Sequence, residues 1–492
     1  MRTPQPVPDA ARRLLKPKTA VVVIHGMGEQ KPMDTLRGLV SALWTHDPDI
    51  AGPRARAVYS KPDPITGSFE LRRITTRNVP LDAGEMKRAD FFEFYWAHLM
   101  TGNTASSVTR WLRGLLLRRP SSVPRRLVFP WIVGLAALSL AAVLLGLAAA
   151  KGLPADVQAA LGVSNLPGWL LVAASIGSLL ISLIATRWLA PVAGDAARYL
   201  SPTPDNVAAR QKIREAGVDL LGKLQASGYY DRIVVVGHSL GAVIGFDVLH
   251  YAWARHAAGD LFRRHGRDTP VLKALGALEK AAGALVHAGP GEVGAARAGY
   301  RAAQRAYAAE LAKGVDGLPP IWLVSDFVTL GCPLSKADVL LARDAADLAV
   351  RTGLRDIPIC PPLLERDDPK RGRFRFSYPV NAVVRIPHHA SVFAPVVWTN
   401  VFFDNALIGL GDIVSGRVAP ILGRGVLDVR LKIGGFAFRH LDYWKDPTAA
   451  PPHPWLKALR RAVNLKRLDD RTLWGAQATA VEVLAEDLGD RL

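Results

Sequence analysis

The strongest constraint on the fold is a β-branched run followed at once by a serine between two glycines. Residues 233–236 read Ile-Val-Val-Val, which is typical of a strand buried on both faces of a parallel sheet. The next five residues read Gly-His-Ser-Leu-Gly, and residues 240–256 then have the pattern of a helix. A strand, a sharp turn and a helix predict that Ser239 presents its hydroxyl at the edge of an α/β sheet. This context favours Ser239 as a nucleophile over an ordinary strand-to-helix turn.

A second predicted strand, far upstream, also ends in a glycine turn. Residues 20–24 read as a buried strand, and His25-Gly26-Met27-Gly28 follows. We expect the backbone N–H of Met27 to be one donor of an oxyanion hole and the N–H of Leu240 to be the other. Two such donors stabilise the charge that develops on a tetrahedral intermediate. The order of the two turns along the chain favours this role over a glycine-rich loop without one.

A serine nucleophile needs a histidine base, and in this order of elements the base comes late in the chain. His388 and His389 precede the strand predicted at 396–403, which is too early. His440 and His453 follow that strand. His440 lies after the strand and before a terminal helix, so it is the preferred base.

The base in turn needs an orienting carboxylate, for which the sequence offers two candidates. Asp404 directly ends the strand predicted at 396–403. Asp412 lies in the turn-like segment 411–416. Physical reasoning alone leaves both open.

Taken together, the chain resembles the α/β-hydrolase superfamily, specifically its bacterial membrane-associated lipase-like members. The segments that carry the resemblance are His25-Gly26-Met27-Gly28, Gly237-His238-Ser239-Leu240-Gly241, Thr329-Leu330-Gly331-Cys332-Pro333-Leu334, Trp398-Thr399-Asn400, Gly411-Asp412-Ile413-Val414-Ser415-Gly416 and His440-Leu441-Asp442-Tyr443-Trp444. The resemblance implies that Asp412 is the acid of a Ser-His-Asp triad. Cys332 stands where relatives carry Ser, and Ile413 stands where they carry Pro; neither change removes a catalytic atom.

Two long uncharged segments interrupt the predicted core. Residues 127–150 and 157–186 carry no charged side chain, and about 20 apolar residues span a bilayer core. We therefore expect a two-helix transmembrane hairpin with spans at about 127–150 and 166–186; the alternative is a pair of buried core helices. Residues 108–119 mix Trp and Leu with Arg, which is typical of a helix lying in a membrane interface.

The basic residues around these segments predict the topology. Arginines gather before the first span, at Arg113, Arg118, Arg119, Arg125 and Arg126, and Lys151 is the basic residue of the loop between the spans. The positive-inside rule then places both outer flanks in the cytoplasm. The expectation is an integral membrane protein whose catalytic domain lies on the cytoplasmic side. The polar start of the chain does not read as a signal peptide, and two cysteines make no disulfide framework.

The fold class predicted from these signals is an α/β-hydrolase fold, a mostly parallel sheet with helices on both faces. Its expected organisation is a first core part at 1–107, the interfacial helix and hairpin at 108–190, the core with the serine turn at 191–255, a helical cap insertion at 256–316 and core completion at 317–492. Further predicted strands lie at 71–79, 91–96, 321–330 and, as the last clear one, 396–403. Further predicted helices lie at 33–44, 205–225, 337–351, 456–465 and 474–488. Glu93, within one strand, is expected to be a buried and paired carboxylate.

The function expected from the sequence is a membrane-anchored serine hydrolase that cleaves acyl esters of lipids or other apolar substrates. The formal net charge of +19 fits an anionic lipid surface better than nucleic acid, because no nucleic-acid-binding motif accompanies it. No metal or organic cofactor is implied. The alternatives are a thioesterase or protein deacylase, and a non-catalytic membrane scaffold on a hydrolase fold.

Overall fold

The computed structural model describes residues 18–27, 31–81, 84–86, 88–100, 117, 120, 123, 128–150, 154–160, 198–200, 204–256, 269–313, 319–368, 373–380, 384–404, 412, 414–432, 439–475 and 481–483. Contacts divide the chain into two units. The first comprises Met1–Gly26, Gln30–Leu99 and Gln211–Arg491, and the second comprises Met27–Glu29, Met100–Arg210 and Leu492. The first unit contains the sheet and the serine turn.

The first unit is built on one large sheet, with strand order β15-β14-β13-β8-β7-β1-β6-β3-β2 in its described part. Its strands are β1 (Lys18–Ile24), β2 (Tyr59–Pro62), β3 (Arg72–Thr75), β6 (Ala89–Phe94), β7 (Tyr230–His238), β8 (Val324–Leu330), β13 (Val397–Phe403), β14 (Leu427–Leu431) and β15 (Val481–Val483). The run from β14 to β6 is parallel, and β15, β3 and β2 pair antiparallel at the two edges. Small antiparallel pairs are formed by β4 (Val79–Leu81) with β5 (Gly84–Met86), β9 (Glu365–Asp368) with β10 (Arg373–Arg375), and β11 (Ser377–Pro379) with β12 (Arg385–Pro387).

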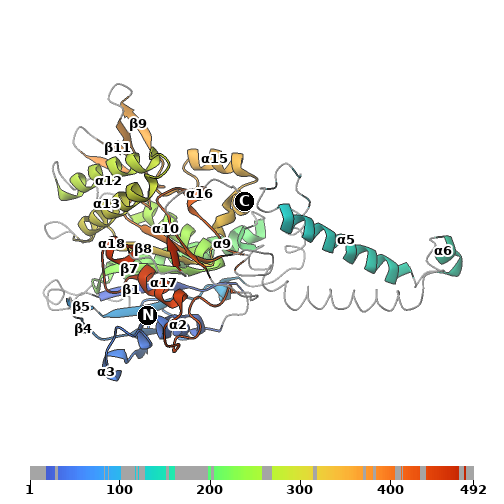
Figure 1. Cartoon of the computed structure of the whole chain (residues 1–492), viewed down its shortest axis with the longest axis horizontal. Helices are drawn as coiled ribbons and strands as arrows, with labels where there is room; N and C mark the ends of the chain where they lie inside the picture. The colour runs from blue at the N-terminus through green and yellow to red at the C-terminus, as the bar shows by residue number, and fades with distance from the viewer. Residues whose placement is uncertain are drawn as a thin grey trace. The chain divides into compact units, whose positions relative to one another are not determined.

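The helices of the first unit flank this sheet (Figure 1). They are α2 (Asp34–Val40), the π-helical η1 (Ser41–Thr45), α3 (Pro53–Arg56), η2 (Ala97–Leu99), α10 (Leu240–His256), α12 (Pro270–Val286), α13 (Val293–Lys313), η6 (Pro333–Lys336), α14 (Ala337–Leu340), α15 (Ala345–Gly353), α16 (Ala419–Leu422), α17 (Pro454–Val463) and α18 (Asp470–Trp474). Most of α9 (Pro204–Ala226) also belongs to this unit.

The alternation of side chains along the central strands explains how both faces are covered. Val21 and Val23 share a buried cluster with Leu36 of α2 and Leu459 of α17. Ile24 points to the opposite face, where Gly245 lets α10 approach closely: a Cβ there would lie 3.2 Å from Ile24 and 2.9 Å from the ring of Phe327. A mostly parallel sheet buried on both sides, with helices on both faces, is therefore present as predicted.

Several predicted elements agree closely with the structure. The strands at 20–24 and 233–236 lie within β1 and β7, and the helix at 240–256 coincides with α10. Residues 33–44, 91–96, 205–225, 321–330 and 456–465 correspond to α2 with η1, β6, α9, β8 and α17. The segment 256–316 contains α12 and α13. The side chains of α13 reach the amino-terminal parts of the neighbouring strands, since Arg305 pairs with Asp326 and Arg301 donates to the carbonyl of Trp398.

Other predictions were wrong, all of them near irregular or short elements. The strand at 396–403 is not the last, because β14 and β15 follow it. The charged residues Asp428 and Arg430 interrupt the apolar pattern of β14, although its Leu427, Val429 and Leu431 are buried. Of the helix predicted at 474–488, the described residues belong to the end of α18 and to the strand β15. The strand at 71–79 divides between β3 and β4, and the helix at 337–351 divides into α14 and α15.

The second unit contains the first predicted membrane span as a helix, α5 (Val128–Ala150, 23 residues), followed by α6 (Ala155–Ala160). Ile132, Leu140 and Val143 of α5 are exposed. Within the described part of the chain, no helix has the length and apolar character needed to cross a membrane. The second predicted span at 166–186 lies outside the described residues, as does nearly all of the predicted interfacial helix at 108–119.

Candidate active site

The serine turn lies where β7 passes into α10, at the carboxyl-terminal edge of the parallel strands. Ser239 has a φ of 52°, a left-handed conformation that non-glycine residues rarely adopt. The turn is closed by the amide of Ala242, which donates to the Ser239 carbonyl over 3.0 Å. A Cβ at Gly241 would lie 2.2 Å from the carbonyl oxygen of Ile24, so glycine is needed where the turn meets β1. The strained turn thus holds the serine beside the ends of two central strands.

The environment of the Ser239 hydroxyl suits a reactive group. The side chain is buried, and its Oγ has no hydrogen-bond partner among the described residues. Buried hydroxyls without partners are uncommon, and in unliganded sites catalytic hydrogen bonds are often long. Leu240 is the first residue of the 17-residue helix α10, so its N–H has no acceptor within the helix. One predicted oxyanion donor therefore lies next to the serine.

The glycine turn after β1 also approaches Ser239. A Cβ at Gly26 would lie 3.0 Å from the Ser239 Cβ and 3.0 Å from His238 Nδ1. His25 is buried, donates from Nδ1 to the Gly26 carbonyl and accepts the Trp96 amide at Nε2. Burial lowers the pKa of His25 to about 4, so the ring is a neutral structural support of the turn. Met27 belongs to the second unit, and its role as the other donor stays a prediction.

The structure brings together the two late candidates, Asp412 and His440. Their side chains are buried, and His440 Nδ1 lies 2.9 Å from Asp412 Oδ1. The same carboxylate accepts the amides of Val414 and Ser415 at Oδ1 and the Tyr443 hydroxyl at Oδ2, over 2.7 Å. Burial alone would raise the pKa of Asp412, but the interactions with His440 and Tyr443 outweigh it and lower the pKa well below its usual range. Asp412 is therefore an ionised acceptor for the His440 N–H.

Two contacts connect this pair to the serine turn. His238 donates from Nε2 to the His440 carbonyl over 2.9 Å, and the two rings are 4.9 Å apart. The Ser239 amide donates to the carbonyl of Leu330, and the next residue, Gly331, faces the pair. A Cβ at Gly331 would lie 3.0 Å from His440 Nδ1 and from Asp412 Oδ2. Gly331 has a φ of 60° and leaves the room in which the imidazole lies.

The other candidate residues lie elsewhere. Asp404 is 40% exposed at its side chain and pairs with Arg430 over 3.7 Å. His453 precedes α17 and stacks on Trp455, with ring centroids 4.0 Å apart. His388 is buried, and its carbonyl accepts the indole N–H of Trp253. Of the alternatives left open by the sequence, the geometry favours Asp412 with His440.

Glu93 is buried, as the sequence predicts. It lies near the end of β6, pairs in register with Val23 of β1, and accepts the amide of Met33 at one oxygen. Burial raises its pKa to about 7, although the Met33 amide acts in the opposite direction. Its described contacts are with the start of α2, so it anchors that helix to the sheet.

Sequence reasoning missed the network that holds the Asp412 loop. Asn400 of β13 donates to the Gly416 carbonyl and to Asp428, while Asp428 accepts the amides of Val418 and Ala419. Both side chains are fully buried. Two polar residues inside otherwise apolar strand segments were the available signal, because buried polar groups are retained only with partners.

An imidazole oriented by a carboxylate near a serine turn has the chemistry of a base and a nucleophile, although the described contacts include no hydrogen bond from Ser239 Oγ to His440. In the described part of the chain, no three His, Cys, Asp or Glu side chains gather as a metal site requires. The cysteine at the unusual position, Cys332, is a buried free thiol whose pKa burial raises to about 12. Comparisons of the chain with protein-family models, curated proteins and solved structures give no match.

Proposed function

We propose that the chain is a serine hydrolase of the α/β-hydrolase type that cleaves acyl esters. The observation that carries the proposal is the hydrogen bond between buried Asp412 and His440 beside a strained Ser239. A carboxylate that accepts from Nδ1 fixes the imidazole tautomer, so that Nε2 is left as the basic nitrogen. The position of Leu240 at a helix start and the pattern around Ser239 add independent support.

In the proposed reaction, Ser239 Oγ attacks the acyl carbonyl while His440 Nε2 takes its proton. The Leu240 N–H, and the Met27 N–H by sequence, stabilise the oxyanion. The bond to the leaving alkoxide breaks as His440 returns the proton, and the acyl group stays on Ser239. Water then attacks this acyl-enzyme with His440 as base, which releases the carboxylic acid and regenerates the serine.

We also propose a membrane-associated substrate, a lipid or other apolar ester, with the catalytic unit on the cytoplasmic side. The support is the uncharged segments 127–150 and 166–186, the exposed apolar residues Ile132, Leu140 and Val143 on α5, and the basic balance of the chain. Thioesters and protein acyl groups are the competing substrates, because the same triad attacks any acyl carbonyl.

The test is labelling by a fluorophosphonate probe, which reacts with activated serines. We expect Ser239→Ala and His440→Ala to lose labelling and to lose on the order of 10⁴-fold in kcat on a short ester. Ser335→Ala is the matched control, since Ser335 is a buried serine in η6, which follows the adjacent strand β8. Thermal unfolding checks that all three variants fold.

Turnover by Ser239→Ala would refute the nucleophile assignment, and full activity of His440→Ala would move the base to another histidine. An intact chain that neither labels nor hydrolyses any ester or thioester would favour the non-catalytic scaffold. A panel of lipid esters, soluble esters and acyl thioesters then separates the substrate classes.

A further inference from the structure

A pocket lies at the opposite end of the strands from Ser239. It has a volume of about 300 Å³ and is lined by the starts of β7 and β8, by α13 and by the turn after α17. Arg232 at its wall precedes Ser239 by seven positions along β7. At the rise of an extended strand this places the pocket roughly 23 Å from the serine. The pocket is therefore separate from the candidate active site.

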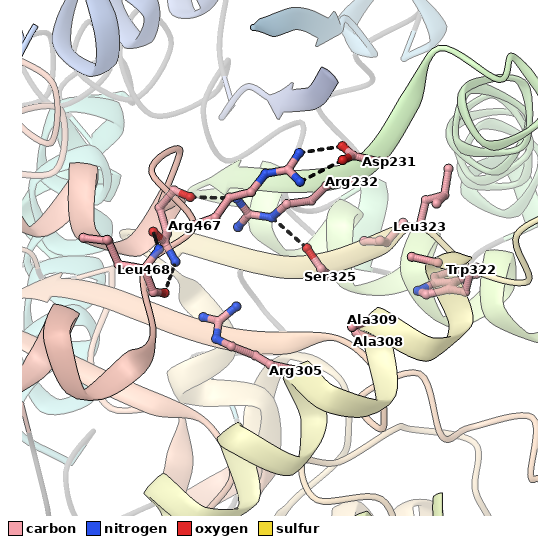
Figure 2. Close-up of a pocket in the computed structure, with 13 residues that line it drawn as sticks. Asp231, Arg232, Arg305, Ala308, Ala309, Trp322, Leu323, Ser325, Arg467 and Leu468 are labelled. Carbon is pink, nitrogen blue, oxygen red and sulfur yellow. Dashed lines mark hydrogen bonds and ion pairs between the residues drawn. The ribbon is translucent and has the colours of Figure 1, made fainter. Parts of the chain in front are cut away.

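Each charged group of this pocket is paired with one of opposite sign, and Figure 2 shows the pair of Arg467 with Asp231. Four arginines share three aspartates: Arg232 and Arg305 pair with Asp326, Arg305 and Arg301 pair with Asp470, and Arg467 pairs with Asp231. Arg232 also donates to Ser325 and to the Asn464 carbonyl, over 3.0 and 2.7 Å. Each of these guanidinium groups already has a carboxylate partner and is not available to bind an anionic ligand. Because no guanidinium of the pocket is left without a carboxylate, the pocket favours a neutral ligand over an anion.

Two hydrogen-bond donors at the pocket remain unused. Trp322 is 1% exposed, and its indole Nε1 has no partner among the described residues. Arg467 Nε is likewise buried without a described partner. Figure 2 shows the nitrogen edge of Trp322 turned toward the labelled residues across the pocket. Buried donors normally have an acceptor, and these two have none among the described residues. A ligand with a hydrogen-bond acceptor could therefore satisfy them.

The rest of the lining is apolar and small. Ala308, Ala309 and Ala312 contribute one wall from α13, and Leu323 contributes another beside Trp322. Ligand sites commonly combine apolar walls with a few placed polar groups, and the volume is at the small end of their range. The open wall of alanines provides space for a flat or slender molecule.

We propose that this pocket binds a neutral, mainly apolar small molecule whose carbonyl oxygen accepts a hydrogen bond from the Trp322 indole. Arg467 Nε supplies a second donor for an occupant with a second acceptor. The site lies apart from the serine and does not depend on the proposed hydrolase function.

Three probes of similar size test the chemistry. Acetanilide is neutral and has one carbonyl oxygen, N-ethylaniline is the same molecule without that oxygen, and benzoate carries a charge. Saturation-transfer NMR on the full-length chain measures each dissociation constant. We expect acetanilide to bind best, with N-ethylaniline weaker by a few-fold to about tenfold, as the loss of one hydrogen bond implies.

Variants locate the binding. Ala309→Leu places a side chain into the pocket from an exposed position and should weaken acetanilide binding at least tenfold. Ala302→Leu is the matched control, because Ala302 is exposed on the same helix, about two turns away, and does not line the pocket. Trp322→Phe should reduce the preference for acetanilide over N-ethylaniline, and Ser239→Ala should change nothing.

Three results would overturn the proposal. These are absence of binding by all three probes, tighter binding of benzoate than of acetanilide, and equal loss of binding in the two alanine variants. Binding lost in Ser239→Ala would instead place the probe in the catalytic site. Loss of fluorophosphonate labelling in Ser239→Ala tests the hydrolase proposal, whereas probe binding tests the pocket proposal. The failure of one can therefore be distinguished from the failure of the other.

Discussion

The surroundings of Asp412 make the substitution Asp412→Asn unusually informative. At Oδ1 all the described partners are donors, His440 Nδ1 and the amides of Val414 and Ser415. Oδ2 faces the Tyr443 hydroxyl, whose oxygen can accept as well as donate. An asparagine therefore fits with its carbonyl oxygen toward His440 and its amide nitrogen toward Tyr443. The variant should fold and keep the imidazole tautomer, while it loses the negative charge and the acceptor of the Tyr443 hydroxyl proton.

In the proposed reaction, that charge stabilises the imidazolium that forms as Ser239 attacks. The His440 Nδ1 to Asp412 Oδ1 distance is 2.9 Å, so the centres of the two charges lie about 4 Å apart. At an effective dielectric constant of about 20, their attraction is about 4 kcal/mol. A loss of this size corresponds to a decrease in kcat of roughly 10³-fold. Asp404→Asn, at a half-exposed carboxylate beside Arg430, should leave kcat within about threefold of the parent.

The assay is kcat on a soluble short-chain ester, with the rate of fluorophosphonate labelling as an independent readout. Thermal unfolding should show Asp412→Asn folded and destabilised by at most about 1–3 kcal/mol, because the Tyr443 hydroxyl proton loses its acceptor. Adding Tyr443→Phe removes the acceptor for the new amide nitrogen and should destabilise the protein by about 1–3 kcal/mol. A kcat within tenfold of the parent, or a larger loss in Asp404→Asn, would refute Asp412 as the group that orients the base.

Three further predictions follow from particular residues. Burial raises the pKa of Glu93 to about 7, so the folded state loses stability as pH rises from about 4.5 through 7. Glu93→Gln should therefore have a free energy of unfolding up to about 3 kcal/mol higher than the parent at pH 8 and an equal one at pH 5, as thermal unfolding at the two pH values can show. A difference that does not depend on pH would contradict this. Gly26→Ala should slow fluorophosphonate labelling at least tenfold, because its Cβ would crowd the Cβ of Ser239, whereas the Cβ of Gly283→Ala would meet open space and should not slow it. Equal labelling rates of the two variants would contradict a role for the close approach of Gly26. For the hairpin expected from the sequence, a single cysteine at Ser164 should label from outside and one at Ser201 should not, in a background without native cysteines. Both positions lie outside the described residues. If both cysteines label from the same side, the two-span topology is excluded.

Sequence patterns predicted the centre of the fold because its strands are long, apolar and followed by glycine turns. The strand before Ser239 and the helix after it are explicit in the residue order, and buried parallel strands leave a continuous β-branched signal. The edge of the sheet gave no such signal. Leu427–Leu431 is short and carries two charged residues, and it forms a strand through its parallel pairing with β13. Long-range partners of this kind are invisible in a local pattern.

The candidate site divides in the same way. Ser239, His440 and the two possible aspartates follow from chain order and residue type. The choice between Asp404 and Asp412 depends on which loop folds back to the imidazole, and that is set by tertiary contacts. The part played by His238 also escaped prediction, since its bond to the His440 carbonyl joins residues far apart in sequence.

The position of β1 between β6 and β7 constrains the order in which the sheet forms. Val23 pairs with Glu93 on one side and with Val236 on the other. The first pairing closes a loop of roughly 70 residues, and the second closes one of more than 200. Loop-closure entropy grows as (3/2)RT ln n, so the second costs about 1 kcal/mol more, which is modest. The larger consequence is temporal: during synthesis β1 and β6 exist without β7 until the whole intervening segment has been made. Over that interval the valines of β1 have an unpaired edge, which makes the nascent amino-terminal part the stage most exposed to misassociation.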